Sequence, residues 1–203
     1  NIGRVLDALD ALGLTRETVV LFTSDNGPSG AGGQDIDFFD SNGPLRGAKR
    51  DLYEGGIRVP LIVRWPGVVA EGAVSEHAAA AWDIMPTLAE IGGRPYAGRT
   101  DGISFLPTLT GNASQPAHES LYWAFYGRGG KQAVRLDRWK GIRLGAYANP
   151  AAPIALYDLD EDLGESRDVS ALHPETVSRI SQVMAQKNRT SWNPEWSFGN
   201  APK

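Results

Sequence analysis

Thr18-Val19-Val20-Leu21-Phe22-Thr23 is a short, continuous run of apolar and β-branched residues. A run of this kind is typical of a strand that is buried in a parallel sheet. Apolar residues at helical spacing precede it over about residues 2–12, and Gly13 follows them as a helix stop. A helix, a tight connection and a buried strand together favour an α/β domain.

A second strand is expected over residues 58–65, with Pro60 either on a sheet edge or near the strand start. Apolar spacing predicts helices over residues 82–91 and 104–109. Residues 1–111 therefore read as part of the α/β domain.

The pattern changes after Gly111. Short strand-like segments follow one another at residues 121–126, 132–136, 139–144 and 154–157. Asp137-Arg138 is expected to join the middle two as a hairpin, and Pro174 suits the start of a helix. We therefore expect residues 112–203 to form a four-stranded antiparallel sheet with one packed helix.

The bulk composition excludes several classes of protein. The 203 residues are 41% hydrophobic and 22% charged, with a net charge of −4 and no cysteine. Disulfides and thiolate metal sites are thus excluded, and no basic patch suggests nucleic acid as a partner. No apolar run approaches the roughly 20 residues of a membrane-spanning helix. The chain starts at Asn1, inside an amphipathic pattern, so we expect residues upstream of it, and no compartment follows.

Asp25-Asn26-Gly27 comes directly after the first predicted strand. Ligands of open α/β sheets bind at the carboxyl ends of strands. One carboxylate and one amide oxygen suit a hard cation such as Ca²⁺ or Mg²⁺, which needs further oxygen ligands from elsewhere. The same residues followed by Pro28 are also ordinary turn composition.

Lys49 lies in a second polar segment, Gly47 to Pro60, which also contains Glu54-Gly55-Gly56 and Arg58. The compact ammonium of a lysine suits a tetrahedral anion. The alternative reading is a solvent-exposed surface lysine, which is the usual position of this residue type.

These two motifs and several others, in this order, resemble the type I sulfatases. The matching segments are Thr18–Pro28, Gly47–Pro60, Trp65-Pro66-Gly67, Asp83-Ile84-Met85-Pro86-Thr87, Asp101-Gly102-Ile103-Ser104, Gln132–Arg135, Asp137–Lys140 and Leu156–Leu159. The resemblance implies the C-terminal portion of an alkaline-phosphatase-like sulfatase fold and, for the intact protein, a sulfuric ester hydrolase. Members of this family are often exported to the periplasm, the lysosome or the outside of the cell.

The resemblance also implies roles for three residues. Asp25 and Asn26 would bind the active-site metal, Ca²⁺ or Mg²⁺, and Lys49 would contact the sulfate group of a sulfated small molecule or glycan. Glu54 to Arg58 would hold the loop that carries Lys49. The family's nucleophile is a formylglycine, made from Cys or Ser in a Cys/Ser-x-Pro-x-Arg motif that precedes these residues.

The chain departs from the family at the nucleophile. It has no Cys, and Ser114-Gln115-Pro116-Ala117-His118 has His in place of Arg and follows Lys49, so it reads as a linker. We expect the formylglycine upstream, in a missing N-terminal half of the same protein, and a chain that alone is inactive and binds calcium weakly or not at all. His77, His118 and His173 are expected in surface or capping roles.

Two alternatives remain open at this stage. One is a phosphoesterase of the same superfamily, because such enzymes bind their metal ions in a similar way. The other is a non-catalytic module that binds a glycan or another partner. The missing nucleophile motivates it, as does the aromatic cluster Tyr122, Trp123, Phe125 and Tyr126. Such a cluster more often belongs to a hydrophobic core than to a sugar-binding face.

Overall fold

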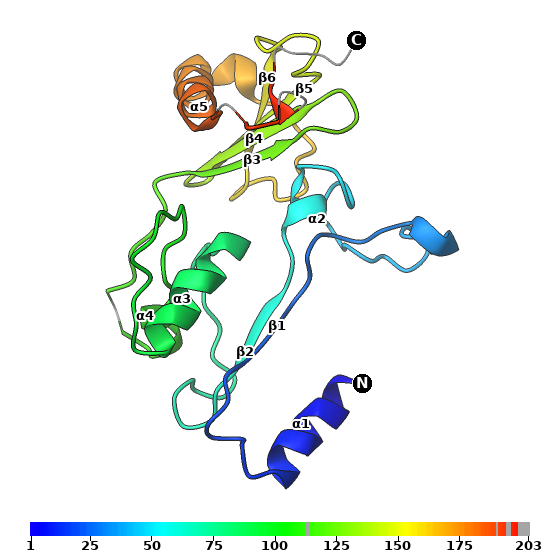
Figure 1. Ribbon diagram of the computed structural model, residues 1–203. Helices are drawn as coiled ribbons and strands as arrows, with labels where there is room; N and C mark the ends of the chain where they lie inside the picture. The colour runs from blue at the N-terminus through cyan, green and yellow to red at the C-terminus, as the bar shows by residue number, and fades with distance from the viewer. Residues whose placement is uncertain (113, 190, 194–195, 199–203) are drawn as a thin grey trace. The chain divides into compact units, whose positions relative to one another are not determined.

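The computed structural model describes residues 1–112, 114–189, 191–193 and 196–198 (Figure 1). Contacts divide the chain into two compact units that interleave in sequence. The first contains Asn1–Asp25 and Pro60–His118, and the second contains Asn26–Val59 and Glu119–Lys203. The expected division into residues 1–111 and 112–203 stays a prediction. No described helix combines the length and the apolar character that a membrane-spanning helix needs.

The first unit is built around a two-stranded antiparallel sheet. Its elements are α1 (Ile2–Ala11), β1 (Val20–Thr23), β2 (Leu61–Arg64), a 3₁₀ turn (Ala81–Asp83), α3 (Ile84–Ile91) and α4 (Leu106–Leu109). Strands β1 and β2 pair from Val20 opposite Arg64 to Thr23 opposite Leu61. Pro60 precedes β2, as one of the two expected placements requires, so its missing N–H removes no bond from the ladder.

The expectation of a strand buried in a parallel sheet is wrong for the described chain. β1 pairs antiparallel with β2, and the Phe22 side chain is 43% exposed. A continuous apolar run indicates that both strand faces suit an apolar environment, but it does not say which neighbours cover them.

The second unit contains the antiparallel sheet expected in the later part of the chain. Its strands are β3 (Leu121–Phe125), β4 (Lys131–Leu136), β5 (Trp139–Leu144) and β6 (Ile154–Asp158), in the order β3-β4-β5-β6. The hairpin between β4 and β5 turns through Asp137, whose φ of 55° is the left-handed conformation that Asp tolerates better than most residues. The four strands and the hairpin are confirmed.

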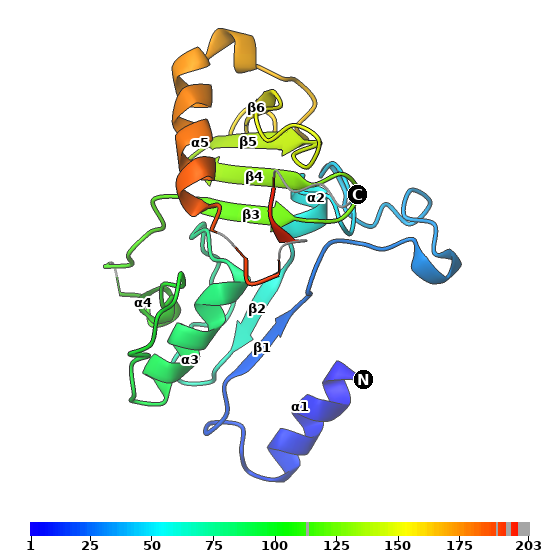
Figure 2. The same ribbon diagram turned by 45° about the horizontal axis from the view of Figure 1, so that its top comes forward.

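Both faces of this sheet are covered. Helix α5 (Pro174–Lys187) lies across one face, where Val134, Leu156, Ile180 and Met184 are fully buried (Figure 2). The short helix α2 (Glu54–Ile57) and the residues just before it cover the other face, against Ala133, Ile142 and Tyr157. Each fully buried aliphatic side chain contributes roughly 1.5–3 kcal/mol to folding.

The aromatic cluster contributes to these two cores. Tyr122 packs on the α5 side, whereas Trp123 and Phe125 pack on the α2 side. This division follows from the alternation of side chains along a strand. The core interpretation is therefore confirmed for these three residues.

The expected surface or capping role of His118 is wrong. Its side chain is 9% exposed, and its Nε2 atom lies 2.9 Å and 3.0 Å from the two carboxylate oxygens of the fully buried Asp83. Asp83 also accepts backbone hydrogen bonds from Ala80 at 2.7 Å and Ile103 at 2.8 Å. A buried carboxylate needs such partners. The segment that ends in His118 is therefore anchored within the first unit by this contact between the imidazole and the carboxylate.

His77 is half-buried in the same unit, and its buried Nε2 atom has no hydrogen-bond partner among the described residues. Burial lowers its pKa below the usual 6.5, although Asp83 opposes the shift. The folded state thus disfavours protonated His77, and the unfolded state binds more protons below pH 6.5. The contribution of neutral His77 to the free energy of unfolding is therefore fully present above pH 6.5, and it is lost as the pH falls through the lowered pKa.

We therefore expect acidification below pH 6.5 to lower the unfolding free energy, and His77→Gln to reduce that dependence. Urea denaturation at several pH values measures both. An identical pH dependence in the two proteins would contradict the assignment to His77.

Candidate functional site

The two polar motifs of the sequence pack directly against each other within the second unit. The Gly27 N–H donates to the Gly56 carbonyl at 2.9 Å, and the Lys49 N–H donates to the Pro28 carbonyl at 2.8 Å. A Cβ atom on Gly27 would lie 1.8 Å from the Gly55 carbonyl oxygen. The backbones therefore approach as closely as glycine allows, and the structure brings Asn26-Gly27-Pro28 and the Lys49 segment together.

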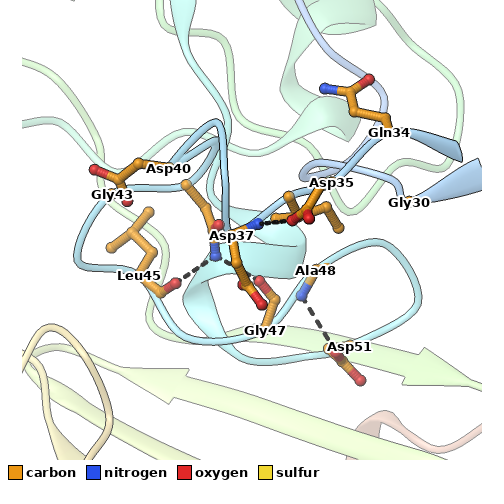
Figure 3. Close-up of a pocket in the computed structure, with 12 residues that line it drawn as sticks. Gly30, Gln34, Asp35, Asp37, Asp40, Gly43, Leu45, Gly47, Ala48 and Asp51 are labelled. Carbon is orange, nitrogen blue, oxygen red and sulfur yellow. Dashed lines mark hydrogen bonds between the residues drawn. The ribbon is translucent and has the colours of Figure 1, made fainter.

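Lys49 occupies the second position of a tight turn, Ala48 to Asp51. The Asp51 N–H donates to the Ala48 carbonyl at 2.8 Å, and the Ala48 N–H donates to Asp51 Oδ2 at 3.2 Å (Figure 3). The third position, Arg50, has a φ of 80°, as a type II turn requires and glycine normally supplies. Lys49 itself is exposed. The turn thus presents its ammonium group to solvent from a fixed backbone.

Asp51 closes the turn as a carboxylate. Burial opposes its ionisation, but hydrogen bonds from Lys131 and Ala48 outweigh that effect and lower its pKa. The side chain therefore stays charged through the neutral pH range and keeps accepting both hydrogen bonds.

A buried charge cluster lies below the loop, where α2 meets the sheet. Lys140 of β5 is fully buried, with its Nζ 2.7 Å from Glu54 Oε1 and 3.1 Å from Glu165 Oε1. Glu165 is also fully buried, and its Oε2 accepts the Glu54 backbone N–H at 2.5 Å. Burial opposes ionisation of Glu54, but Lys140 outweighs it and lowers the pKa. Burial raises the pKa of Glu165 despite Lys140. One ammonium group therefore holds two carboxylates, of which Glu54 is the stronger partner.

Arg46, just before the turn that carries Lys49, contacts Glu165 of this charge cluster. Its guanidinium donates to the Glu165 carbonyl at 2.8 Å and lies 4.0 Å from the centre of the Tyr53 ring. Glu165 has a φ of 51°, an uncommon backbone conformation for a residue with a side chain. Several contacts to one residue explain how that conformation is maintained.

A cavity of about 660 Å³ opens beside the turn, inside the segment 30–51 (Figure 3). Its lining includes four carboxylates, from Asp35, Asp37, Asp40 and Asp51. Lys49 is not among the lining residues. This acidic cavity is unsuited to binding an anion by itself.

The two metal ligands implied by the sequence are consecutive residues, one assigned to each unit. Asp25 ends the first unit and is exposed, and Asn26 begins the second and is half-buried. Asn26 Nδ2 donates to the Gly27 carbonyl at 2.9 Å, so its oxygen is the atom suited to a cation. Within the described ranges, no group of three or more His, Asp or Glu residues is arranged to hold a metal. The two oxygen donors fit part of a Ca²⁺ or Mg²⁺ shell, whose other ligands must come from elsewhere.

Known proteins with similar sequences and structures point to one family. Residues 1–93 match the family described as Sulfatase. Steryl-sulfatase of Mus musculus is 35% identical, over 91% of this chain and 34% of its own length. Arylsulfatase A of Homo sapiens is 32% identical, over 92% and 41%. The crystal structure of Ps i-CgsB in complex with k-i-k-neocarrahexaose superimposes with a TM-score of 0.81 and 26% identity, over 97% of this chain and 42% of that one. The chain belongs to the sulfatase family.

This sulfatase-family chain spans 34% of the length of the steryl-sulfatase and 41% of the length of the arylsulfatase A. Its fold is part of the alkaline-phosphatase-like sulfatase fold, with the small antiparallel sheet and its helix as expected. The roles of Asp25, Asn26 and Lys49 stay predictions. The sequence reading missed Lys131, Lys140 and Glu165, which fix the loop that carries Lys49.

Proposed function

We propose that this chain is the C-terminal part of a metal-dependent sulfatase that hydrolyses sulfate esters. Asp25 and Asn26 provide two ligands of a Ca²⁺ or Mg²⁺ ion, and Lys49 contacts the sulfate group. The observation that carries the proposal is the direct bonding between the two motifs, from Gly27 to Gly56 and from Lys49 to Pro28. Membership of the sulfatase family supports the sulfate ester as the substrate class.

The metal and the chain would each stabilise the negative charge of the sulfate group. A bound cation supplies Lewis-acid stabilisation of sulfate oxygens. The chain supplies the Lys49 ammonium, a compact positive charge that the Ala48–Asp51 turn holds in place for an anionic group. The hydrogen bonds from Gly27 to Gly56 and from Lys49 to Pro28 hold Asn26-Gly27-Pro28 against the segment that contains this turn. The substrate is a sulfated small molecule or glycan.

The proposal places the formylglycine nucleophile in an N-terminal half of the same protein, without which the chain is inactive. Exposed apolar side chains in the first unit support such a missing part. Ile2, Val5 and Leu12 of the α1 region and Phe22, Leu61 and Ile62 of the two strands are between 38% and 71% exposed. A concentration of exposed apolar residues in one unit usually marks a surface that another protein segment covers.

The test compares variants of the intact protein, including its upstream part, on an aryl sulfate. We expect Lys49→Ala and Asp25→Ala each to lower kcat/KM by about 100- to 1000-fold, as the loss of one group that stabilises developing charge does in other enzymes. Lys187→Ala, at the exposed end of α5, is the control and should retain the wild-type rate.

Other outcomes separate the two alternatives. An intact protein that hydrolyses an aryl phosphate but not the sulfate would support the phosphoesterase. Tight binding of a sulfated glycan without turnover, unchanged by Lys49→Ala and Asp25→Ala, would support the non-catalytic module.

A further inference from the structure

A second lysine contacts the turn that carries Lys49, from the strand beneath it. Lys131, the first residue of β4, donates from Nζ to the Arg50 carbonyl at 2.9 Å and to Asp51 Oδ1 at 2.6 Å. Its side chain is 12% exposed, whereas Lys49 is exposed to solvent. Lys131 thus directs its charge at the turn and not at solvent.

The turn needs such a partner because its backbone conformation is unfavourable. Arg50 has a φ of 80°, where the Cβ of an L-residue is crowded against its own backbone. The hydrogen bond from Lys131 is made to the carbonyl of this same residue. Without it, a type I turn would suit an arginine better at this position and would rotate the peptide that follows Lys49.

The position of Lys131 in the sheet makes it a rigid support. β4 pairs with β3 on one side and with β5 on the other, and Lys131 itself pairs with Phe125 and Leu144. The Lys131 ammonium also faces the Phe125 ring, with 5.8 Å between Nζ and the ring centre. Side chains on paired strands hold a geometry more closely than side chains on loops.

We propose that Lys131 is a positioning residue for Lys49, which keeps the Ala48–Asp51 turn in the conformation that presents the Lys49 ammonium to a sulfate group. This inference rests on the proposed function of Lys49. Lys131 is not a second sulfate ligand in this assignment, because its side chain is only 12% exposed and two of its three N–H donors bond to a carboxylate and a carbonyl.

The test uses the intact protein and 4-nitrophenyl sulfate. Lys131→Met keeps the length of the side chain and removes the charge. We expect it to lower kcat/KM by about 10- to 100-fold, which is the usual effect of losing a residue that orients an active-site group. Lys187→Met is the matched control and should keep the wild-type kcat/KM.

A second substitution separates positioning from a general structural role. Arg50→Gly removes the Cβ that makes a φ of 80° unfavourable, so the turn should form without its support. We expect Lys131→Met/Arg50→Gly to recover at least several-fold in kcat/KM over Lys131→Met. Full activity of Lys131→Met, or no recovery in the double variant, would overturn the inference.

A readout that does not depend on turnover separates this inference from the proposed function. The Asp51 N–H is bonded within the turn, so its hydrogen exchange should be faster in Lys131→Met and slow again in the double variant. An inactive wild-type protein would refute the proposed function, and unchanged Asp51 exchange in Lys131→Met would refute the positioning role.

Discussion

Lys140→Met is expected to lower the unfolding free energy of the second unit by about 3–5 kcal/mol. The substitution leaves Glu54 and Glu165 buried side by side without the ammonium that lies 2.7 Å and 3.1 Å from their oxygens. Breaking a buried ion pair from one side is more destabilising than removing the whole pair, because the remaining charge stays desolvated. Arg58, at 3.4 Å from Glu54, is too exposed to replace Lys140.

Urea denaturation measures the loss of unfolding free energy in Lys140→Met. Hydrogen exchange of the segments 46–60 and 139–144 shows whether the loss is centred on the charge cluster. Lys187→Met is the control for losing a lysine, and it should change the unfolding free energy by no more than about 0.5 kcal/mol. Adding Glu54→Gln and Glu165→Gln to Lys140→Met removes the orphaned charges and should recover part of the loss. A Lys140→Met protein as stable as the wild type would show that the cluster does not stabilise this unit.

Gly27→Ala is expected to have the largest effect on activity of any substitution outside the charged residues. The added Cβ would lie 1.8 Å from the Gly55 carbonyl oxygen, a separation that no side-chain rotation can relieve. The backbone must move, and the hydrogen bond from Gly27 to Gly56 is lost with it. A shift of about 1 Å between catalytic groups can reduce a rate about 100-fold, so we expect kcat/KM to fall at least that far.

Gly30→Ala is the matched control from the same loop. Its Cβ would have ordinary contacts, the nearest at 3.5 Å to the Gln34 carbonyl oxygen, and its φ of −78° suits any residue. Aryl sulfate turnover by the intact protein should therefore stay close to the wild-type rate in Gly30→Ala. Equal activity of Gly27→Ala and Gly30→Ala would mean that the contact with Gly55 does not hold the site.

The sequence predicted the four-stranded sheet and helix α5 of the second unit, because their signals are local, but it did not predict the short helix α2. Strands β3 to β6 alternate between two apolar faces, Asp137 accepts the left-handed turn, and Pro174 begins α5. The antiparallel pairing of β1 was not predicted, since a short apolar run carries no information about its neighbour. The family motifs predict metal binding by Asp25 and Asn26 and sulfate contact by Lys49, and these roles stay predictions.

The residues that support the site escaped the sequence reading for a physical reason. Lys140 and Glu54 are 86 positions apart, and Lys131 and Asp51 are 80 apart. The identity of a lysine or a carboxylate in the sequence does not indicate which distant residue it will contact. One signal was present for Lys140, which falls between Trp139 and Gly141-Ile142 in a buried strand. A charged residue at such a position needs a buried counter-charge, and that argument predicts a partner without identifying it.

The covering of the sheet by α2 on one face and α5 on the other has a consequence for biosynthesis. Residues 26–59 leave the ribosome well before the strands on which they pack, which end at Asp158, and before α5, which ends at Lys187. At about 5–20 residues per second the delay is on the order of 10 s. The loop that carries Lys49 can therefore make its native contacts with Lys131 and Glu165 only after those residues have been made. A chain truncated before Lys131 is expected to keep every residue of this loop and to lose the contacts that order it.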